Sequence, residues 1–208
     1  MNSDEFLDAV RKENETALSR LGSSKSLYAA TDGEMEPDDV FDAAADAEYA
    51  AAQTFEGWAD DEADESASEL FADIAEVENG HYERVSGKVD DHDPGETPAL
   101  HEYLRGLDDT TERLGGFVGR TLASEKSKKQ MTGFFTGKAD PKTAQLFREL
   151  NGDLDEQLDD TLALLDERCG SDEEWETANK AAKDAITAAY DEYTESLESM
   201  GVNPKPVC

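Results

Sequence analysis

The sequence predicts an all-α fold, a bundle of about six helices. Apolar residues recur every three to four positions through most of the chain, and turn-forming clusters separate these periodic segments. No segment shows the convincing alternation of a strand. The 208 residues suffice for one helical domain, which we expect over residues 1–201, followed by a proline-rich tail at 202–208.

Capping and turn residues set the boundaries of the first three helices. Asn2, with Glu5 three residues later, is expected to cap the first helix. Pro37 suits the first turn of the second helix, and Ser66 is expected to cap the third. The three predicted helices span roughly residues 2–28, 37–60 and 66–89.

Turn chemistry also separates the last three helices. The loop 90–97 contains Asp-Asp-His-Asp-Pro-Gly, and the fourth helix is expected to begin near Pro98. A second break falls at 136–141, and residues 169–171 end the fifth helix and cap the sixth. These helices span roughly residues 98–135, 142–168 and 172–200.

A weak internal repeat relates residues 21–26 to residues 122–127. The two segments read Leu-Gly-Ser-Ser-Lys-Ser and Leu-Ala-Ser-Glu-Lys-Ser, and each precedes a Thr/Gly turn, a proline and an amphipathic helix. Two related helical hairpins would explain the similarity. Chance similarity in a biased composition is the alternative.

The charge of the chain restricts its partners and its setting. Asp and Glu total 51 against 19 Lys and Arg, which gives a formal charge of −32. Such an excess argues against binding to nucleic acid or to anionic membranes. Concentrated salt screens the self-repulsion of an acidic surface, so we expect a halophilic, cytoplasmic protein. The residues after Met1 predict no signal peptide, and no apolar run is long enough to span a membrane.

The two cysteines, Cys169 and Cys208, are far apart and form no Cys-x-x-Cys motif. One chain therefore cannot build a zinc knuckle or a four-cysteine iron site. We expect two reduced thiols, with a Cys169–Cys208 disulfide as the alternative.

The most informative motif is Glu78-Asn79-Gly80-His81, a Glu-x-x-His on a predicted helix. Glu78 and His81 fall in the apolar stripe formed by positions 71, 74, 78, 81 and 85. A buried carboxylate requires a partner, and residues three apart on a helix can share one metal ion. A hydrogen-bonded histidine at the edge of the core is the simpler alternative.

Two further polar residues interrupt apolar stripes. Glu48 lies in the stripe of the second predicted helix, and an antiparallel hairpin would bring it to Glu78 and His81. Two carboxylates and one imidazole suit iron or manganese. Asn14, on the first helix, is a neutral amide that we interpret as a hydrogen-bonding residue.

Residues 48–59 and 70–81 together resemble the first helical hairpin of rubrerythrins and other ferritin-like proteins. The matching positions are Glu48, Ala51, Phe55, Trp58 and Ala59, then Phe71, Ala75, Glu78 and His81. The resemblance covers about a fifth of the chain. It implies a ferritin-like four-helix bundle with extra helices, and half of a di-iron site formed by Glu48, Glu78 and His81.

The second half of that site departs from the family pattern. Glu112 is the candidate for the third carboxylate, but Gly115 and Gly119 replace the expected alanine and aromatic residue. The positions of the second Glu-x-x-His fall on Leu154 and Gln157, which cannot replace a carboxylate and an imidazole. The expectation is therefore a single-metal site, completed by Glu112, or a site that has lost its metal.

Two functional hypotheses follow. The first is a rubrerythrin-like protein that binds iron or manganese and handles iron or peroxide. It would need an external electron donor, because the chain lacks the Cys-x-x-Cys pairs of a rubredoxin-like module. The second is a non-catalytic scaffold or interaction protein that kept only the bundle.

Basic residues gather between positions 120 and 142. We interpret them as favourable placements at a helix C-terminus. A docking patch for an acidic partner, or for a second copy in a homo-oligomer, is the alternative. The cluster consists of Arg120, Lys126, Lys128, Lys129, Lys138 and Lys142.

Overall fold

The computed structural model describes residues 1–205. These residues form nine α-helices joined by turns and loops, and they contain no strand. The predicted all-α class is confirmed, with more helices than the six expected. The helices are α1 (Ser3–Glu13), α2 (Glu15–Leu21), α3 (Ser24–Ala30), α4 (Pro37–Asp61), α5 (Glu65–Ser86), α6 (Ala99–Arg105), α7 (Thr110–Gly137), α8 (Pro141–Arg168) and α9 (Asp172–Ser199).

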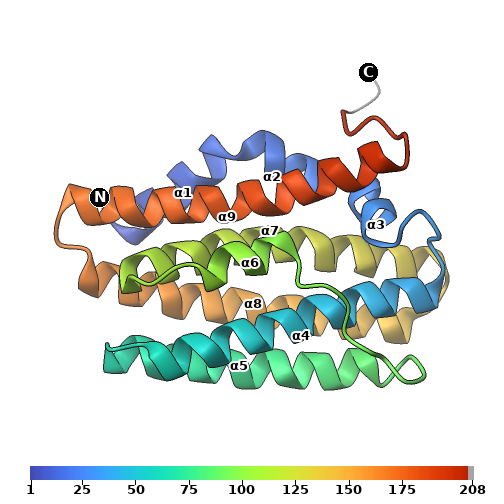
Figure 1. Ribbon diagram of the computed structural model, residues 1–208, viewed down its shortest axis with the longest axis horizontal. Coiled ribbons are helices and arrows are strands. Elements are labelled where there is room, and N and C mark those ends of the chain that lie inside the picture. The colour runs from blue at the N-terminus through green and yellow to red at the C-terminus, as the bar shows by residue number, and fades with distance from the viewer. Residues whose placement is uncertain (206–208) are drawn as a thin grey trace.

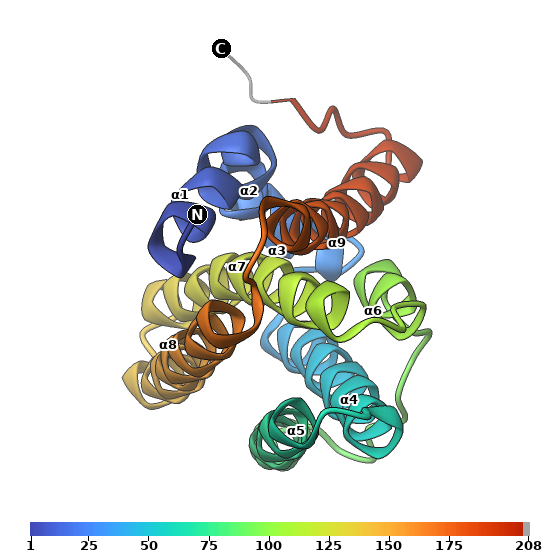
Figure 2. The same cartoon turned by 90° about the vertical axis from the view of Figure 1, so that its left-hand side faces the viewer.

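Two long helical hairpins form the centre of the molecule. Helices α4 and α5 form one antiparallel hairpin, and α7 and α8 form the other (Figure 1). Helix α9 packs along α7 on the side away from α4 and α5, with α1 and α2 beside it (Figure 2). Helix α6 lies between α4 and α9, so α7 is enclosed on several sides.

The extra helices arise where polar side chains compete with the backbone of two predicted long helices. The first predicted helix is divided into α1, α2 and α3. Asn14 donates from its side chain to the Val10 carbonyl at 2.8 Å, as expected for a hydrogen-bonding residue, and ends α1. The hydroxyl of Ser23 donates to the Arg20 carbonyl between α2 and α3. Residues 21–26 therefore span a helix break, whereas residues 122–127 lie within α7.

The fourth predicted helix is divided into α6 and α7. The carboxylate of Asp109 accepts hydrogen bonds from the backbone N–H groups of Thr111 and Glu112 and starts α7 as its N-cap. Leu107, in the intervening turn, is buried, so the apolar stripe continues across the break. That continuity explains why the pattern alone resembled one helix.

Most other predicted ends are confirmed. Asn2 and Glu5 form a capping box, and Pro37 is the first residue of α4. Ser171 caps α9. The prediction that Ser66 caps α5 was wrong. Asp64 is the N-cap, and its side chain accepts a hydrogen bond from the Ala67 N–H.

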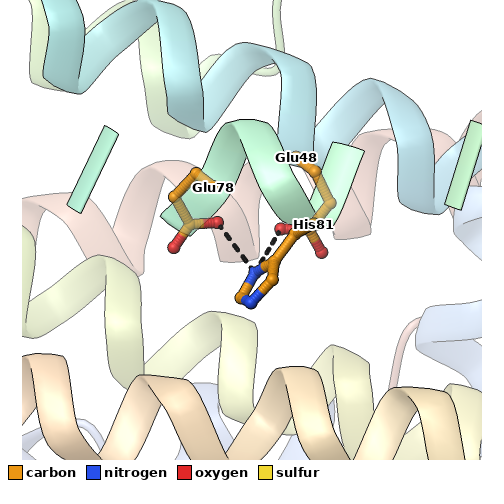
Figure 3. Close-up of side chains that lie close together, drawn as sticks. All are labelled: Glu48, Glu78 and His81. Carbon is orange, nitrogen blue, oxygen red and sulfur yellow. Dashed lines mark ion pairs between the residues drawn. The ribbon is translucent and has the colours of Figure 1, made fainter. Parts of the chain in front are cut away.

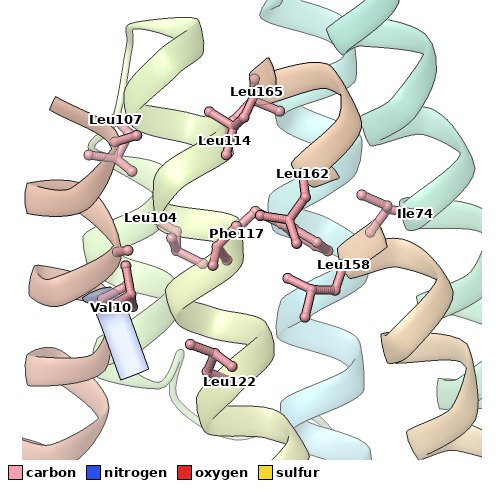
Figure 4. Close-up of a cluster of buried hydrophobic side chains, with 14 of the residues drawn as sticks. Val10, Ile74, Leu104, Leu107, Leu114, Phe117, Leu122, Leu158, Leu162 and Leu165 are labelled. Carbon is pink, nitrogen blue, oxygen red and sulfur yellow. The ribbon is translucent and has the colours of Figure 1, made fainter. Parts of the chain in front are cut away.

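The main core lies where α7 meets α8, α9 and the α4–α5 hairpin (Figure 4). Full burial of each large apolar side chain contributes about 1.5–3 kcal/mol. The core residues that Figure 4 labels are Val10, Ile74, Leu104, Leu107, Leu114, Phe117, Leu122, Leu158, Leu162 and Leu165.

Two glycines allow α9 to approach α7 closely. A Cβ atom added to Gly115 would lie 2.2 Å from the Ala178 carbonyl oxygen, and one added to Gly119 would lie 2.2 Å from the Ala182 carbonyl oxygen. These are the two positions that depart from the ferritin-like pattern. Glycine is required at both because any side chain would clash with the backbone of α9.

Cys169 is a buried free thiol, and burial raises its pKa to about 11. Cys208 lies outside the described residues, so the disulfide alternative is not tested. Residues 202–205 of the expected tail are not helical. Within residues 1–205, the helices are too short or too polar to cross a membrane.

Candidate metal site

Helices α4 and α5 bring Glu48, Glu78 and His81 together in the interior (Figure 3). Glu78 and His81 are three residues apart, so they lie side by side on one face of α5. The antiparallel partner α4 presents Glu48 to the same point. All three residues are at most 2% exposed. The juxtaposition expected from the two apolar stripes is therefore present.

Three potential ligand atoms of this cluster face one another. His81 Nδ1 lies 3.5 Å from Glu78 Oε2 and 3.6 Å from Glu48 Oε2. One ligand atom from each residue lies within 4.8 Å of the other two. His81 Nδ1 and Glu48 Oε2 are buried without a hydrogen-bond partner in residues 1–205. A metal ion, or a proton on Nδ1 that forms ion pairs with the two glutamates, would satisfy these atoms.

The other nitrogen of His81 is held by a carboxylate from a third helix. His81 Nε2 lies 2.8 Å from Asp153 Oδ2 on α8, so the ring donates its Nε2 proton to Asp153. This hydrogen bond fixes the ring with Nδ1 toward the two glutamates. A histidine that binds a metal through one nitrogen commonly donates from the other to a carboxylate in this way.

Two cations from α7 pair with the glutamates. The guanidinium of Arg120 forms two hydrogen bonds of 3.0 Å with the two carboxylate oxygens of Glu78. Lys128 Nζ donates to Glu48 Oε1 at 2.6 Å. Arg120 is 1% exposed and Lys128 is 4% exposed, so solvent screens these pairs little. Each glutamate thus has a basic partner on the side facing α7.

The charges of the cluster determine its protonation. Burial disfavours the charged form of Glu78, but the charges of Arg120 and Lys128 and the hydrogen bonds from His81 and Arg120 together outweigh it and hold the pKa of Glu78 well below its ordinary value. Burial likewise disfavours a charged His81, but Glu48 and Glu78 together raise the pKa of His81 to about 9. Near neutral pH the metal-free cluster therefore contains a protonated His81.

The positions that would form the second half of a di-iron site lie outside the cluster or have no ligand side chain. Glu112 lies half-exposed in the first turn of α7, eight residues or about 12 Å along the axis from Arg120, and outside the cluster. Leu154 is a core residue. Gln157 is 7% exposed, and both polar atoms of its side chain lack a hydrogen-bond partner within residues 1–205.

The sequence did not identify three participants in this site. Arg120 and Lys128 were interpreted as favourable placements at a helix C-terminus, and that interpretation was wrong for both, because they lie inside α7 and are buried against glutamates. Their spacing of eight residues, which puts both on one face of α7, was the available signal. Asp153 has no distinguishing signal among 51 acidic residues.

The other histidines lie outside the cluster. His92, in the loop before α6, pairs with Asp46 on α4 at 3.1 Å. His101 is 3% exposed, and its Nδ1 lies 3.0 Å from the hydroxyl of Thr54. Burial and the nearby charge of Arg120 lower the pKa of His101 to about 3, so its ring is neutral near neutral pH.

Comparison with protein-family models, with curated proteins and with solved structures finds no match for this chain. The functional interpretation therefore depends on the geometry of the site and on the resemblance of the α4–α5 hairpin.

Proposed function

We propose that the chain binds one divalent transition-metal ion, iron or manganese, between Glu48, Glu78 and His81. The observation that carries the proposal is the pair of orphaned atoms, His81 Nδ1 and Glu48 Oε2, which face each other and Glu78 Oε2 inside the protein. Carboxylate oxygen and imidazole nitrogen are suitable ligands for these metals.

The separations between these atoms fit a shared ion. Metal–oxygen and metal–nitrogen bonds of this kind are about 2.0–2.2 Å, so two ligand atoms of one ion are at most about 4.4 Å apart. The separations of 3.5 Å and 3.6 Å from His81 Nδ1 lie within that limit. The hydrogen bond to Asp153 supports the same reading, because it leaves the lone pair of Nδ1 for the ion once that nitrogen is deprotonated.

Arg120 and Lys128 favour one ion over two. Their combined charge equals that of a second divalent ion, and they pair with the same two glutamates. Within residues 1–205 the cluster contains two glutamates and one histidine, and no fourth carboxylate or imidazole has a ligand atom within 4.8 Å of all three. We therefore propose that these cations replace the second half of the di-iron site that the resemblance implies.

The resemblance to rubrerythrins extends the proposal to a role in iron or peroxide handling. A bound ion would supply Lewis acidity or redox chemistry, and an external donor would supply electrons. The residues of the chain would hold the ion, orient His81 through Asp153, and exclude water from the glutamates.

A scaffold without metal is the second candidate, and the Arg120–Glu78 pair favours it. A bidentate guanidinium already satisfies both oxygens of Glu78, and the positive charges of Arg120 and Lys128 oppose the entry of a cation. In this reading the cluster is an ion-pair network that specifies how the two hairpins pack.

Metal analysis distinguishes the two candidates. The untagged protein would be equilibrated anaerobically with Fe²⁺ or with Mn²⁺, desalted, and analysed for metal content. We expect one tightly held ion per chain, and its loss in Glu78→Gln and His81→Gln. Because an acidic chain attracts cations everywhere, Glu83→Gln, an exposed carboxylate on α5, is the matched control and should keep the ion. Metal-free parent protein, or binding unchanged in both site variants, would establish the scaffold.

A further inference from the structure

A cavity of about 560 Å³ adjoins the metal-site cluster: Glu48 is among its lining residues, whereas Glu78 and His81 are not. Residues from α2, α3, α4, α6, α7 and α9 line it, together with the segment that leads into α6. Exposed Asp32, Glu96 and Glu192 lie at its mouth, whereas His101 and Leu100 are buried lining residues. Its volume is in the range of small-molecule sites, about 300–1,000 Å³.

The hydrogen bonds of Thr54 determine which nitrogen of His101 carries the proton. The Thr54 hydroxyl donates its one proton to the Ala50 carbonyl at 2.7 Å and accepts from Arg105 Nε at 3.1 Å. It can therefore only accept from His101 Nδ1, 3.0 Å away. A neutral His101 protonated at Nδ1 has an unprotonated Nε2.

The Nε2 atom of His101 is thus a hydrogen-bond acceptor on a ring that lines the cavity. Within residues 1–205 it makes no hydrogen bond, and the residue is 3% exposed. An acceptor on a cavity wall can take a hydrogen bond from a bound molecule. A ligand that uses this acceptor must carry an N–H or O–H group.

The charged residues around the cavity favour a cation. Five carboxylates line it against two basic side chains, Arg120 and Lys128. Glu48 is paired with Lys128 and Asp46 with His92, so three of the five have no ion pair within residues 1–205. Both basic groups are already paired, with Glu78 and Glu48 respectively. The carboxylates are Asp32, Asp46, Glu48, Glu96 and Glu192.

The rest of the lining is small or apolar. Alanines of α3, α4 and α7 leave the space open, and Leu100 and Met131 provide apolar contacts. A short hydrocarbon chain fits this lining better than a strongly polar body.

We propose that this cavity binds a small organic ammonium ion that carries a short apolar chain. An N–H group of the ligand donates to His101 Nε2, its charge is attracted by the acidic mouth, and its chain packs against Leu100 and Met131. The site does not require the metal, so the same binding is expected in protein treated with a chelator.

Titration with matched probes, followed by NMR at one fixed ionic strength, tests the proposal on chelator-treated protein. Hexylammonium should bind and shift resonances of cavity residues. N,N,N-Trimethylhexylammonium has the same charge and chain but no N–H donor, and should bind about tenfold more weakly, the value of one hydrogen bond. Hexanoate should bind more weakly than either. Equal affinity for hexylammonium and its trimethyl analogue, or tighter binding of hexanoate, overturns the proposal.

Variants separate the hydrogen bond from the charge. His101→Phe keeps an aromatic ring but removes the acceptor, so the preference for hexylammonium over its trimethyl analogue should disappear. Glu192→Gln should weaken both cations, whereas Glu195→Gln, an exposed residue of α9 outside the cavity lining, should weaken neither to the same extent. If His101→Phe does not fold, the comparison of Glu192→Gln with Glu195→Gln decides the outcome. Equal losses of affinity for the cations in these two variants contradict a bound cation in the cavity.

Discussion

Arg120 and Glu78 form a bidentate ion pair in which both hydrogen bonds are 3.0 Å long and both side chains are at most 2% exposed. The pair joins α7 to α5, and thus one long hairpin to the other. A buried ion pair of this kind contributes less net stability than its contacts suggest, because both charges lose their hydration. Removal of one partner is costly, since it leaves the other charge buried and alone.

Arg120→Leu should therefore lower the free energy of unfolding of the metal-free protein by about 3–5 kcal/mol. The double variant Arg120→Leu/Glu78→Leu should recover much of this loss, because no charge is left unpaired. Denaturant unfolding measures both. Arg84→Ala, which breaks the exposed Arg84–Glu149 pair, is the control and should cost about 0–1 kcal/mol. Equal costs for Arg120→Leu and Arg84→Ala would contradict the buried pair.

Asp153→Ala should weaken binding of the proposed metal about 10–100-fold, because the hydrogen bond that orients His81 is lost. Calorimetric titration with Mn²⁺ measures the change. Asp155→Ala, an exposed carboxylate two residues along α8, removes the same charge without touching His81 and should leave the affinity nearly unchanged. A similar loss in both variants would show that only the overall charge matters.

Metal binding should become tighter as the pH rises toward 9. The pKa of His81 is about 9 in the metal-free protein, and a metal ion requires its unprotonated Nδ1. Binding below pH 9 therefore releases one proton, and the apparent affinity should rise about tenfold per pH unit. Titrations between pH 6 and pH 8 in two buffers of different ionisation enthalpy would reveal the released proton. An affinity independent of pH contradicts the role of His81.

His101 should make the protein less stable in acid. Its pKa is about 3 when folded against an ordinary value of 6.5, so the unfolded chain takes up a proton first as the pH falls. The contribution is fully present above pH 6.5 and is lost progressively toward pH 3, by an amount on the order of 4 kcal/mol. The free energy of unfolding of the parent and of His101→Phe, measured between pH 6.5 and pH 3, isolates the contribution of His101. The difference between the two should shrink in acid, and a constant difference would contradict the prediction.

Gly119→Ala should destabilise the protein by about 1–3 kcal/mol or more, as overpacking does, because the new Cβ would lie 2.2 Å from the Ala182 carbonyl oxygen. Gly133→Ala is the matched control in the same helix, with no atom within 4 Å of the new Cβ, and should stabilise by about 0.5–1 kcal/mol. Thermal unfolding compares the two. Stabilisation by both substitutions would show that α7 and α9 are not in close contact.

The sequence by itself determined the helical class, most helix ends, and the convergence of Glu48, Glu78 and His81. Each depends on local chemistry or on helical spacing, which a single chain displays directly: Asn2 caps, Pro37 begins a helix, and residues three apart share a face.

Only the tertiary structure decided what surrounds that cluster. Arg120, Lys128 and Asp153 reach it from α7 and α8, and their distance along the chain hides the contact. In a chain with 51 acidic residues, a carboxylate carries little information until its partner is known. The division of the fourth predicted helix was hidden for a different reason: the buried Leu107 continues the apolar stripe through the turn, and Asp109 then begins α7 as its N-cap.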